Sequence, residues 1–351
     1  MCGPDLPSVK RPSYLWAGFA ICGTLPVTLL RTAPLSRRWS KKLRKATRPA
    51  RHWLLWQTVR AIESLMGALP PRAAIQWGAR LGRLGLLVDR RDGRLAQRHL
   101  EQAFGAAMSE AQRRRVTRGI FENLGRCGAE LCVVRRRGPA FLKDRYTFSG
   151  EENILRFVRA GRGAVVVTAH LDNWEMAGHC VTQLLGLRTL VVAQRQSDAM
   201  IEQWINDTRR RMGMTVHIRG EDARFLLQRL REGDVLFTLL DQDTGESGAF
   251  VPFFGRPAFT LTGPAILAVR TGVPLLTAFS RRNPDGLTHH IHFNEPLEDS
   301  VPRDGVAPRG EERDRRAVEL TRRATEQIEA AIRQAPDQWV WFHERWKRQP
   351  S

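Results

Sequence analysis

The pattern of apolar and polar positions divides the chain into two parts. Between residues 72 and 137, apolar residues recur every three to four positions, which predicts helices over residues 73–88, 94–104 and 109–134. From residue 150 onward, short apolar runs alternate with helical periods. The first run, Ala-Val-Val-Val-Thr at 164–168, is typical of a strand buried on both faces. Strands that alternate with helices predict an α/β domain with a mainly parallel sheet flanked by helices.

The expected elements of this domain indicate where to look for chemistry. Strands are expected at residues 164–168, 189–193, 215–218, 235–240, 274–279 and 288–293. Helices are expected at residues 174–185, 200–211, 223–231, 262–270 and 311–334. Ligands of open α/β sheets bind beyond the carboxyl ends of the strands, so residues that follow strands are the first candidates for a site.

The N-terminal segment, residues 1–51, combines an uncharged run with a strongly basic one. Residues 12–30 carry no charge, and their number is close to the roughly 20 residues that cross a bilayer, so they are a candidate transmembrane anchor. A cleaved signal peptide and an Arg-rich transit peptide are alternative interpretations. No Asp or Glu lies between Asp5 and Glu63, and a retained anchor would place this basic stretch and the large domain on the cytoplasmic side.

Residues 52–149 are expected to form a helical region that associates with the membrane at its start. The apolar residues of one helical face lie close to tryptophans, which favour the membrane interface, and this favours a helix in the membrane plane. The face comprises Leu55, Val59, Ile62 and Met66, with Trp53 and Trp56 nearby. The alternative is an ordinary helix that faces the core. The remaining residues, 150–351, are expected to form the α/β domain.

Composition and charge narrow the class of protein. Hydrophobic residues make up 42% of the chain and charged residues 26%, which excludes a disordered chain and a wholly membrane-embedded one. The net charge of +20 favours polyanionic partners: nucleic acid, anionic lipid headgroups or an acidic protein. No recognised nucleic-acid-binding motif is present. The five cysteines and the group His289, His290 and His292 do not match metal-ligand patterns, so neither a metal nor a cofactor is expected.

The first expected strand leads directly into residues suited to acyl transfer. His170 follows it, and Glu175 lies five positions further, so a turn must intervene before the two side chains meet. A neutral imidazole can take the proton of an attacking alcohol at physiological pH, and Glu175 would hold the tautomer of the ring. Asp172 or Asn173 can cap the following helix and supply the turn. The alternative is a capping box of Asp172 and Glu175, with His170 as an ordinary turn residue.

Several further motifs occur in an order that one enzyme family shares. After His-x4-Glu come Asp-Gln-Asp at 241–243, Phe-Val-Pro-Phe-Phe-Gly at 250–255, Thr-Leu-Thr-Gly at 260–263 and Thr-Gly-Val-Pro at 271–274. Near the C-terminus lie Pro-Asp-Gln-Trp at 336–339 and Trp-Phe-His-Glu-Arg-Trp at 341–346. The ordered set resembles the lauroyl and myristoyl transferases of late lipid A biosynthesis in the bacterial inner membrane, within the lysophospholipid acyltransferase superfamily.

This resemblance implies a reaction and a set of site residues. A fatty acyl chain would pass from an acyl carrier protein thioester, or from acyl coenzyme A, to a hydroxyl of a lipid A precursor at the cytoplasmic face of the inner membrane. His170 would be the general base and Glu175 its partner. The candidate substrate contacts are Asn173, Arg195, Asp241, Phe250, Phe253 and Phe254. The three phenylalanines would line an acyl groove, touch the bilayer or pack as core.

Other functions stay open at the level of sequence. After Arg195, the residues Gln196-Ser197-Asp198 replace the Pro and Asn-Pro that are common in the family, which puts the contact with the acceptor in question. Enzymes of the actinobacterial type, which acylate phosphatidylinositol mannosides, share the His-x4-acid element. A hydrolase of the same fold would pass the acyl group to water. A basic, membrane-anchored scaffold would have no catalytic activity.

Two groups of residues outside the motif also allow more than one interpretation. The residues Arg209, Arg210 and Arg211 would either steer an acidic carrier protein or form a solvated face. The residues Trp339, Trp341 and Trp346 would either anchor the C-terminus at the membrane interface or dock onto the core.

Overall fold

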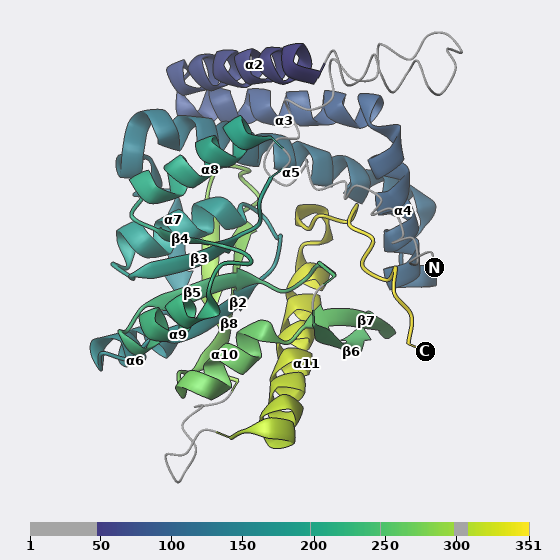
Figure 1. The fold of residues 1–351 in the computed structure, drawn as a ribbon. Helices are drawn as coiled ribbons and strands as arrows, with labels where there is room; N and C mark the ends of the chain where they lie inside the picture. The colour runs from purple at the N-terminus through teal and green to yellow at the C-terminus, as the bar shows by residue number, and fades with distance from the viewer. Residues whose placement is uncertain (1–47, 197, 246, 298–307, 351) are drawn as a thin grey trace, which may run out of the picture.

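The computed structural model describes residues 48–196, 198–245, 247–297 and 308–350 (Figure 1). The candidate transmembrane anchor at residues 12–30 therefore lies outside the described residues. Among the helices within those ranges, none combines the length and apolarity that a membrane crossing requires.

A layer of helices precedes the sheet. It comprises α2 (Arg48–Ala68), α3 (Pro71–Val88), α4 (Arg90–Phe104) and α5 (Glu110–Arg137), followed by the short η3 (Gly138–Leu142). Ser109 and Gln112 form a capping box at the start of α5. Figure 1 shows α2, α3 and α5 stacked across one end of the sheet. On α2, Val59 and Met66 are buried and Ile62 packs against the core, so these three residues of the apolar face predicted for the membrane point inward.

Close approach of backbones holds α3 against α5. Gly78 and Gly82 of α3 face Gly125 of α5, and a Cβ atom added to Gly125 would overlap the carbonyl oxygen of Gly78. No side chain separates the two helices at this point, so only glycine fits there.

The predicted parallel sheet is confirmed, with two additions. Its seven strands run in the order β1-β9-β8-β2-β5-β3-β4, and every neighbouring pair is parallel except β8–β9. The strands are β1 (Tyr146–Ser149), β2 (Ala164–Thr168), β3 (Thr189–Ala193), β4 (Thr215–Ile218), β5 (Val235–Leu239), β8 (Leu275–Arg282) and β9 (His289–Phe293). Strand β1 falls inside the region expected to be helical, and β8 is longer than predicted.

Helices cover both faces of the sheet. One face carries α6 (Glu152–Arg159), α7 (Trp174–Leu184) and α8 (Ala199–Arg211), and the other carries α9 (Ala223–Arg231), α10 (Gly263–Thr271) and α11 (Gly310–Gln334). The alternation along β2 explains this arrangement. Val165 and Val167 belong to one core cluster, whereas Ala164 and Val166 belong to the other. A strand buried on both faces must be apolar throughout, as β2 is.

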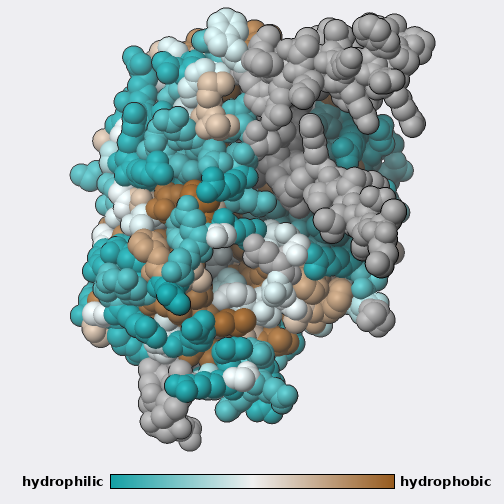
Figure 2. Space-filling model, viewed as in Figure 1, coloured by the Kyte–Doolittle hydropathy of each residue, from teal (hydrophilic) through white to brown (hydrophobic). Residues whose placement is uncertain are grey.

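A hairpin and the C-terminal segment complete the core beside α11. Strands β6 (Gly248–Phe253) and β7 (Arg256–Leu261) form an antiparallel pair in a stretch where neither a strand nor a helix was expected. Phe254 and Gly255 make the turn with positive φ values of 51° and 69°. Beyond η4 (Pro336–Gln338), the three C-terminal tryptophans are buried, so they dock onto the core. On the face seen in Figure 2, apolar side chains gather between α8 and α10 within a mainly hydrophilic surface.

Replacing Gly125 with Ala should lower the free energy of unfolding by about 3 kcal/mol, because the new methyl group overlaps the backbone of α3. Gly263→Ala is the matched control, since nothing lies within 4 Å of a Cβ at that position, and it should change stability by less than about 0.5 kcal/mol. Denaturant unfolding followed by circular dichroism measures both. Equal stability of the two variants would contradict the close packing of α3 on α5.

Candidate active site

His170 is held at the carboxyl end of the sheet by a buried carboxylate. It follows β2, and Asp241 follows the adjacent strand β5, so the parallel pairing of the two strands brings both residues to one edge. The Nδ1 atom of His170 lies 2.8 Å from one carboxylate oxygen of Asp241, and the backbone N–H of His170 donates to the other oxygen at 2.9 Å. The indole N–H of Trp339 also donates to Asp241, at 2.6 Å.

Asp241 is charged despite its burial. Burial alone would raise the pKa of its carboxyl group, but the His170 ring and the donated hydrogen bonds outweigh this effect and lower the pKa to about 2. A charged carboxylate accepts a hydrogen bond, so the neutral imidazole carries its proton on Nδ1. Its Nε2 then holds the lone pair, and no described polar group bonds to it. The ring of Trp174 packs edge-on against the imidazole of His170, with the two ring centroids 4.9 Å apart.

Glu175 pairs with an arginine rather than with the histidine. It lies in the first turn of α7, and Arg209 at the end of α8 donates to it through Nε at 3.0 Å and through a second nitrogen. Arg209 also donates to Asn206 at 3.0 Å. Burial would raise the pKa of Glu175, but the positive charge of Arg209 outweighs it and lowers the pKa. The expected contact of Glu175 with the imidazole is thus replaced by two separate pairs, His170–Asp241 and Glu175–Arg209.

An apolar cavity of about 60 Å³ opens beside the Glu175–Arg209 pair and is lined by Trp174, whose ring contacts His170. It lies between α7 and the sheet, and Glu175, Arg209 and Trp174 line its polar end. The rest of its lining is mainly apolar and includes Val181, Val191, Met214, Phe237, Leu239 and Ile291. The site therefore joins a base, an ion pair and an apolar space.

A buried network of charges fixes the turn between His170 and α7. Asp172 is fully buried with a positive φ of 52°. Its carboxylate accepts hydrogen bonds from Ser280 and from Nδ1 of His289, both at 2.6 Å. Nε2 of His289 lies 3.1 Å from Glu130 of α5, and Arg282 makes two hydrogen bonds to Glu130, of 2.6 and 2.9 Å. The two acids and two bases of this network are all charged, so their charges cancel inside the protein.

The pKa values of this network follow from its pairing. Burial would lower the pKa of His289, but Asp172 and Glu130 outweigh it and raise the pKa to about 9. Burial likewise opposes the charged forms of Asp172 and Glu130, and their cationic partners lower both pKa values nonetheless. The free-energy cost of burying these charged groups is therefore concentrated in one region, which packs directly behind the turn that follows His170.

Comparison with known proteins identifies the family. The model of the bacterial lipid A biosynthesis acyltransferases matches residues 40–348. The chain belongs to this family. It is 27% identical to the lipid A biosynthesis lauroyltransferase of Escherichia coli over 309 residues. This aligned stretch covers 86% of this chain and 94% of that relative. It is 26% identical over 307 residues to the lipid A biosynthesis myristoyltransferase of the same organism, covering 85% and 88%.

A second group of relatives matches a shorter part of the chain. The phosphatidylinositol mannoside acyltransferase of Mycobacterium tuberculosis is 34% identical over 162 residues, which cover 44% of this chain and 51% of that relative. Membership of the family confirms the resemblance drawn from the ordered motifs, and the chain is an acyltransferase.

The other predicted substrate contacts lie in different environments. Asn173 is buried, caps α7 by accepting from Met176 at 3.2 Å, and donates to Glu130 at 2.8 Å. The Asp172–Glu175 capping box is therefore wrong, because Asn173 is the cap. Arg195 is largely exposed and lies 4.0 Å from Glu221.

The three phenylalanines of the FVPFFG motif separate into two environments. Phe253 and Phe254 are buried in the core, packed against the C-terminal tryptophans, whereas Phe250 is exposed on the hairpin. Of the three placements expected for these residues, Phe253 and Phe254 therefore show core packing. Their roles as substrate contacts, like those of Asn173 and Arg195, stay predictions.

Sequence reasoning missed the role of Arg209 and the network behind the turn. Arg209 stood in a run of three arginines that were expected to steer a carrier or face solvent, and its place on the inner side of α8 gave no separate signal. Glu130 and Arg282 lie 152 positions apart, so no local pattern connects them. The one usable signal was Trp339, which ends the Pro-Asp-Gln-Trp motif and donates a hydrogen bond to Asp241.

The raised pKa of His289 predicts a loss of stability at alkaline pH. The folded protein binds this proton more tightly than the unfolded chain, so its contribution is complete below about pH 6.5 and is lost as pH rises through about 9. The difference from the ordinary value of 6.5 corresponds to about 3 kcal/mol. His289→Gln should abolish this decline, whereas His292→Gln, an exposed position on the same strand, should keep it. Denaturant unfolding between pH 6 and 10 measures the effect, and equal slopes in the two variants would show that His289 is not held as its cation.

Proposed function

We propose that this enzyme transfers a fatty acyl chain from an acyl thioester to a hydroxyl of a glycolipid of the lipid A precursor type, with His170 as the general base. The observation that carries the proposal is the His170–Asp241 pair, which leaves Nε2 of the imidazole without a partner among the described residues, while the ring contacts Trp174 at the wall of the apolar cavity. The match of the family over most of the chain supports the class of reaction and of acceptor.

In the proposed reaction, Nε2 of His170 takes the proton of the acceptor hydroxyl as its oxygen attacks the thioester carbonyl. The resulting tetrahedral intermediate collapses, the ester bond forms, and the carbon–sulfur bond breaks. The imidazolium then returns the proton to the departing thiolate. Asp241 stabilises the imidazolium because it stays charged beside it. A base of this kind contributes roughly 10²–10⁴ in rate.

The Glu175–Arg209 pair would set the electrostatics of the same space. Glu175 holds the guanidinium of Arg209 at the polar end of the cavity, where the positive charge can stabilise a developing oxyanion. The first backbone N–H groups of α7 add the positive end of a helix dipole there. In this proposal Glu175 acts through Arg209 and not through the imidazole.

The apolar cavity would receive the start of the acyl chain. Its volume of about 60 Å³ is small beside the roughly 300–1,000 Å³ of common ligand pockets. Binding of a long chain therefore requires the side chains between α7 and the sheet to move apart. Met214 is suited to this, because its flexible thioether lines the cavity.

The donor and the membrane would both meet a basic surface. The net charge of +20 attracts an acidic acyl carrier protein and anionic lipid, and acyl coenzyme A is the alternative donor. The helices α2 and α3 expose the large apolar side chains Trp53, Leu54, Leu65, Trp77, Leu84 and Leu87. We place these side chains in the interface of the inner membrane, with the catalytic domain at its cytoplasmic face. Interfacial tryptophans beside exposed arginines such as Arg60 and Arg80 fit an anionic bilayer.

A phosphatidylinositol mannoside is a second candidate acceptor. The observation in its favour is the identity of 34% over 162 residues with an enzyme named for that lipid, compared with 27% for the lauroyltransferase over a longer match. Both acceptors are glycolipids, so the proposed chemistry is the same.

Acyl transfer by the purified full chain in lipid vesicles, with labelled acyl carrier protein as donor, tests the base. His170→Ala should lower kcat/KM by roughly 10²–10⁴. Asp241→Asn should lower it by at least about 10², because the imidazolium loses its counter-charge. Glu175→Gln should lower it through displacement of Arg209. The matched control is His292→Ala, which removes an exposed histidine from β9 and should leave the rate unchanged.

The products of the same assay separate the rival functions. Acylated lipid A precursor supports the first acceptor, and acylation of phosphatidylinositol mannoside alone supports the second. Free fatty acid without acylated lipid identifies a hydrolase. Full activity of a folded His170→Ala variant would contradict the proposed base, and absence of any acyl product in the wild type would contradict both proposed acceptors.

The membrane face of α2 and α3 has its own test. The double variant Trp53→Gln/Leu65→Gln should bind anionic vesicles at least about tenfold more weakly than the wild type, because each apolar side chain contributes roughly 1.5–3 kcal/mol when fully buried. Phe225→Gln on α9, also an exposed aromatic, is the control and should bind as the wild type does. Vesicle co-sedimentation measures the partition, and equal binding of all three proteins would show that this face does not contact the bilayer.

A further inference from the structure

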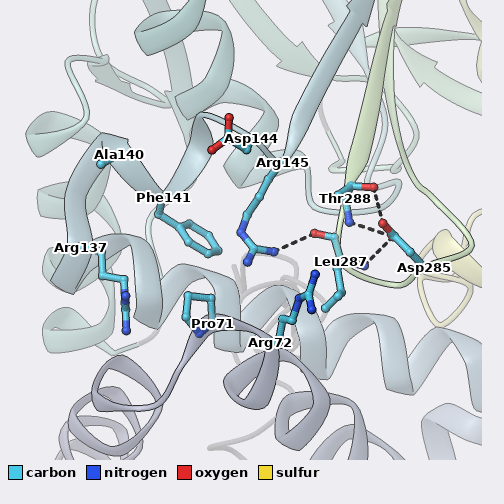
Figure 3. Close-up of a pocket in the computed structure, with 10 residues that line it drawn as sticks. All are labelled: Pro71, Arg72, Arg137, Ala140, Phe141, Asp144, Arg145, Asp285, Leu287 and Thr288. Carbon is cyan, nitrogen blue, oxygen red and sulfur yellow. Dashed lines mark hydrogen bonds between the residues drawn. The ribbon is translucent and has the colours of Figure 1, made fainter.

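A second cavity, of about 640 Å³, lies away from the candidate active site. It is bounded by the start of α3, by η3 after α5, and by the turn between β8 and β9 (Figure 3). It shares no lining residue with the apolar cavity beside Glu175. Its lining includes the three arginines Arg72, Arg137 and Arg145, together with the apolar residues Pro71 and Phe141.

None of the three arginines forms an ion pair with a carboxylate within the described residues. Arg145 donates to the carbonyl of Leu287 at 3.1 Å and lies 4.7 Å over the ring of Phe141. Arg137 donates only to a carbonyl, that of Leu69, at 3.1 Å. The guanidinium of Arg72 has no bonded partner in the described part of the chain, and it lies near that of Arg145 in Figure 3.

The arrangement of these arginines has an electrostatic cost. Burial lowers the pKa of Arg145, the carboxylate of Glu130 raises it, and the charge of Arg72 lowers it, so the two guanidinium groups repel each other. An anion between them would remove the repulsion and offer each a charge-assisted hydrogen bond.

The acidic residues of the cavity do not supply that anion. Asp285 accepts hydrogen bonds from the backbone of Leu287 at 2.8 Å and of Thr288 at 2.9 Å, and from the Thr288 hydroxyl at 2.7 Å, so it is engaged in its own turn. The carboxylate of Asp144 points away from the guanidinium groups (Figure 3).

The start of α3 adds a further positive feature. This helix has 18 residues, no side chain caps its N-terminus, and its first turn has no acidic residue. The positive end of its dipole therefore meets the cavity at Pro71 without a counter-charge from within the described chain.

We propose that this cavity binds the phosphate group of a phosphorylated ligand. Planar guanidinium groups match phosphate oxygens, and an uncapped helix N-terminus favours the same charge. The cavity is larger than a phosphate ion, and Phe141 and Pro71 provide an apolar wall for the group that carries the phosphate. The proposal does not depend on the acyl-transfer reaction, because the site shares no residue with it.

Isothermal titration calorimetry of the full chain with inorganic pyrophosphate tests the site. The wild type should bind, and Arg72→Gln and Arg137→Gln should each weaken binding by about tenfold or more, as expected for loss of a hydrogen bond to a charged group. Arg231→Gln, an exposed arginine on α9, is the matched control and should bind as the wild type does. Absence of binding in the wild type, or equal weakening in the control, would overturn the proposal.

Competition then identifies the source of the phosphate group. Displacement of pyrophosphate by coenzyme A, with loss of that displacement in Arg72→Gln, indicates a soluble phosphate ester. Displacement only by vesicles that contain phosphatidic acid, and not by vesicles of phosphatidylcholine, indicates a lipid headgroup. If neither competes while pyrophosphate binds, the cavity holds an adventitious ion only and the proposal is overturned.

Discussion

The structure depends most on the buried carboxylate of Asp241. It receives hydrogen bonds from the backbone and ring of His170 and from Trp339, which come from the end of β2 and from the C-terminal segment. A fully buried carboxylate without these partners would be protonated or would destabilise the fold. Three parts of the chain that are distant in sequence must therefore meet at this point. The same bonds orient the imidazole and leave its Nε2 available, so the requirement of folding and that of the proposed chemistry coincide.

The second constraint is the turn that carries His170 away from Glu175. Asp172 adopts a positive φ that is unfavourable for a residue with a side chain. Its hydrogen bonds to Ser280 and His289, together with the pairing of Arg282 and Glu130, stabilise the turn from behind. The C-terminal segment closes it from the other side, since Gln338 accepts from the backbone of Asp172 at 2.9 Å. The base is thus placed by rigid elements on both sides.

The sequence predicted the strands and helices of the α/β domain well, because the central strands β2, β3 and β5 are short, largely apolar runs separated by helices. It missed β1 and the β6–β7 hairpin, where short runs contain Pro, Gly and polar residues and acquire strand structure only through pairing with distant segments. In the site, His170 was found from its place after β2. The partner of its ring, Asp241, was not found, because the sequence also offers Glu175 only five positions from His170. Asp241 lies 71 positions away and is brought near only by strand pairing.

The measurement that tests the central claim most directly is a double-mutant cycle of kcat/KM between His170 and Asp241. If Asp241 acts through the imidazole, Asp241→Asn should cost little further activity in a His170→Ala background, although it costs about 10² or more in the wild type. The same cycle with Glu175→Gln should give nearly independent losses, because Glu175 pairs with Arg209. Multiplicative losses for His170 and Asp241, with strong coupling between His170 and Glu175 instead, would contradict the account.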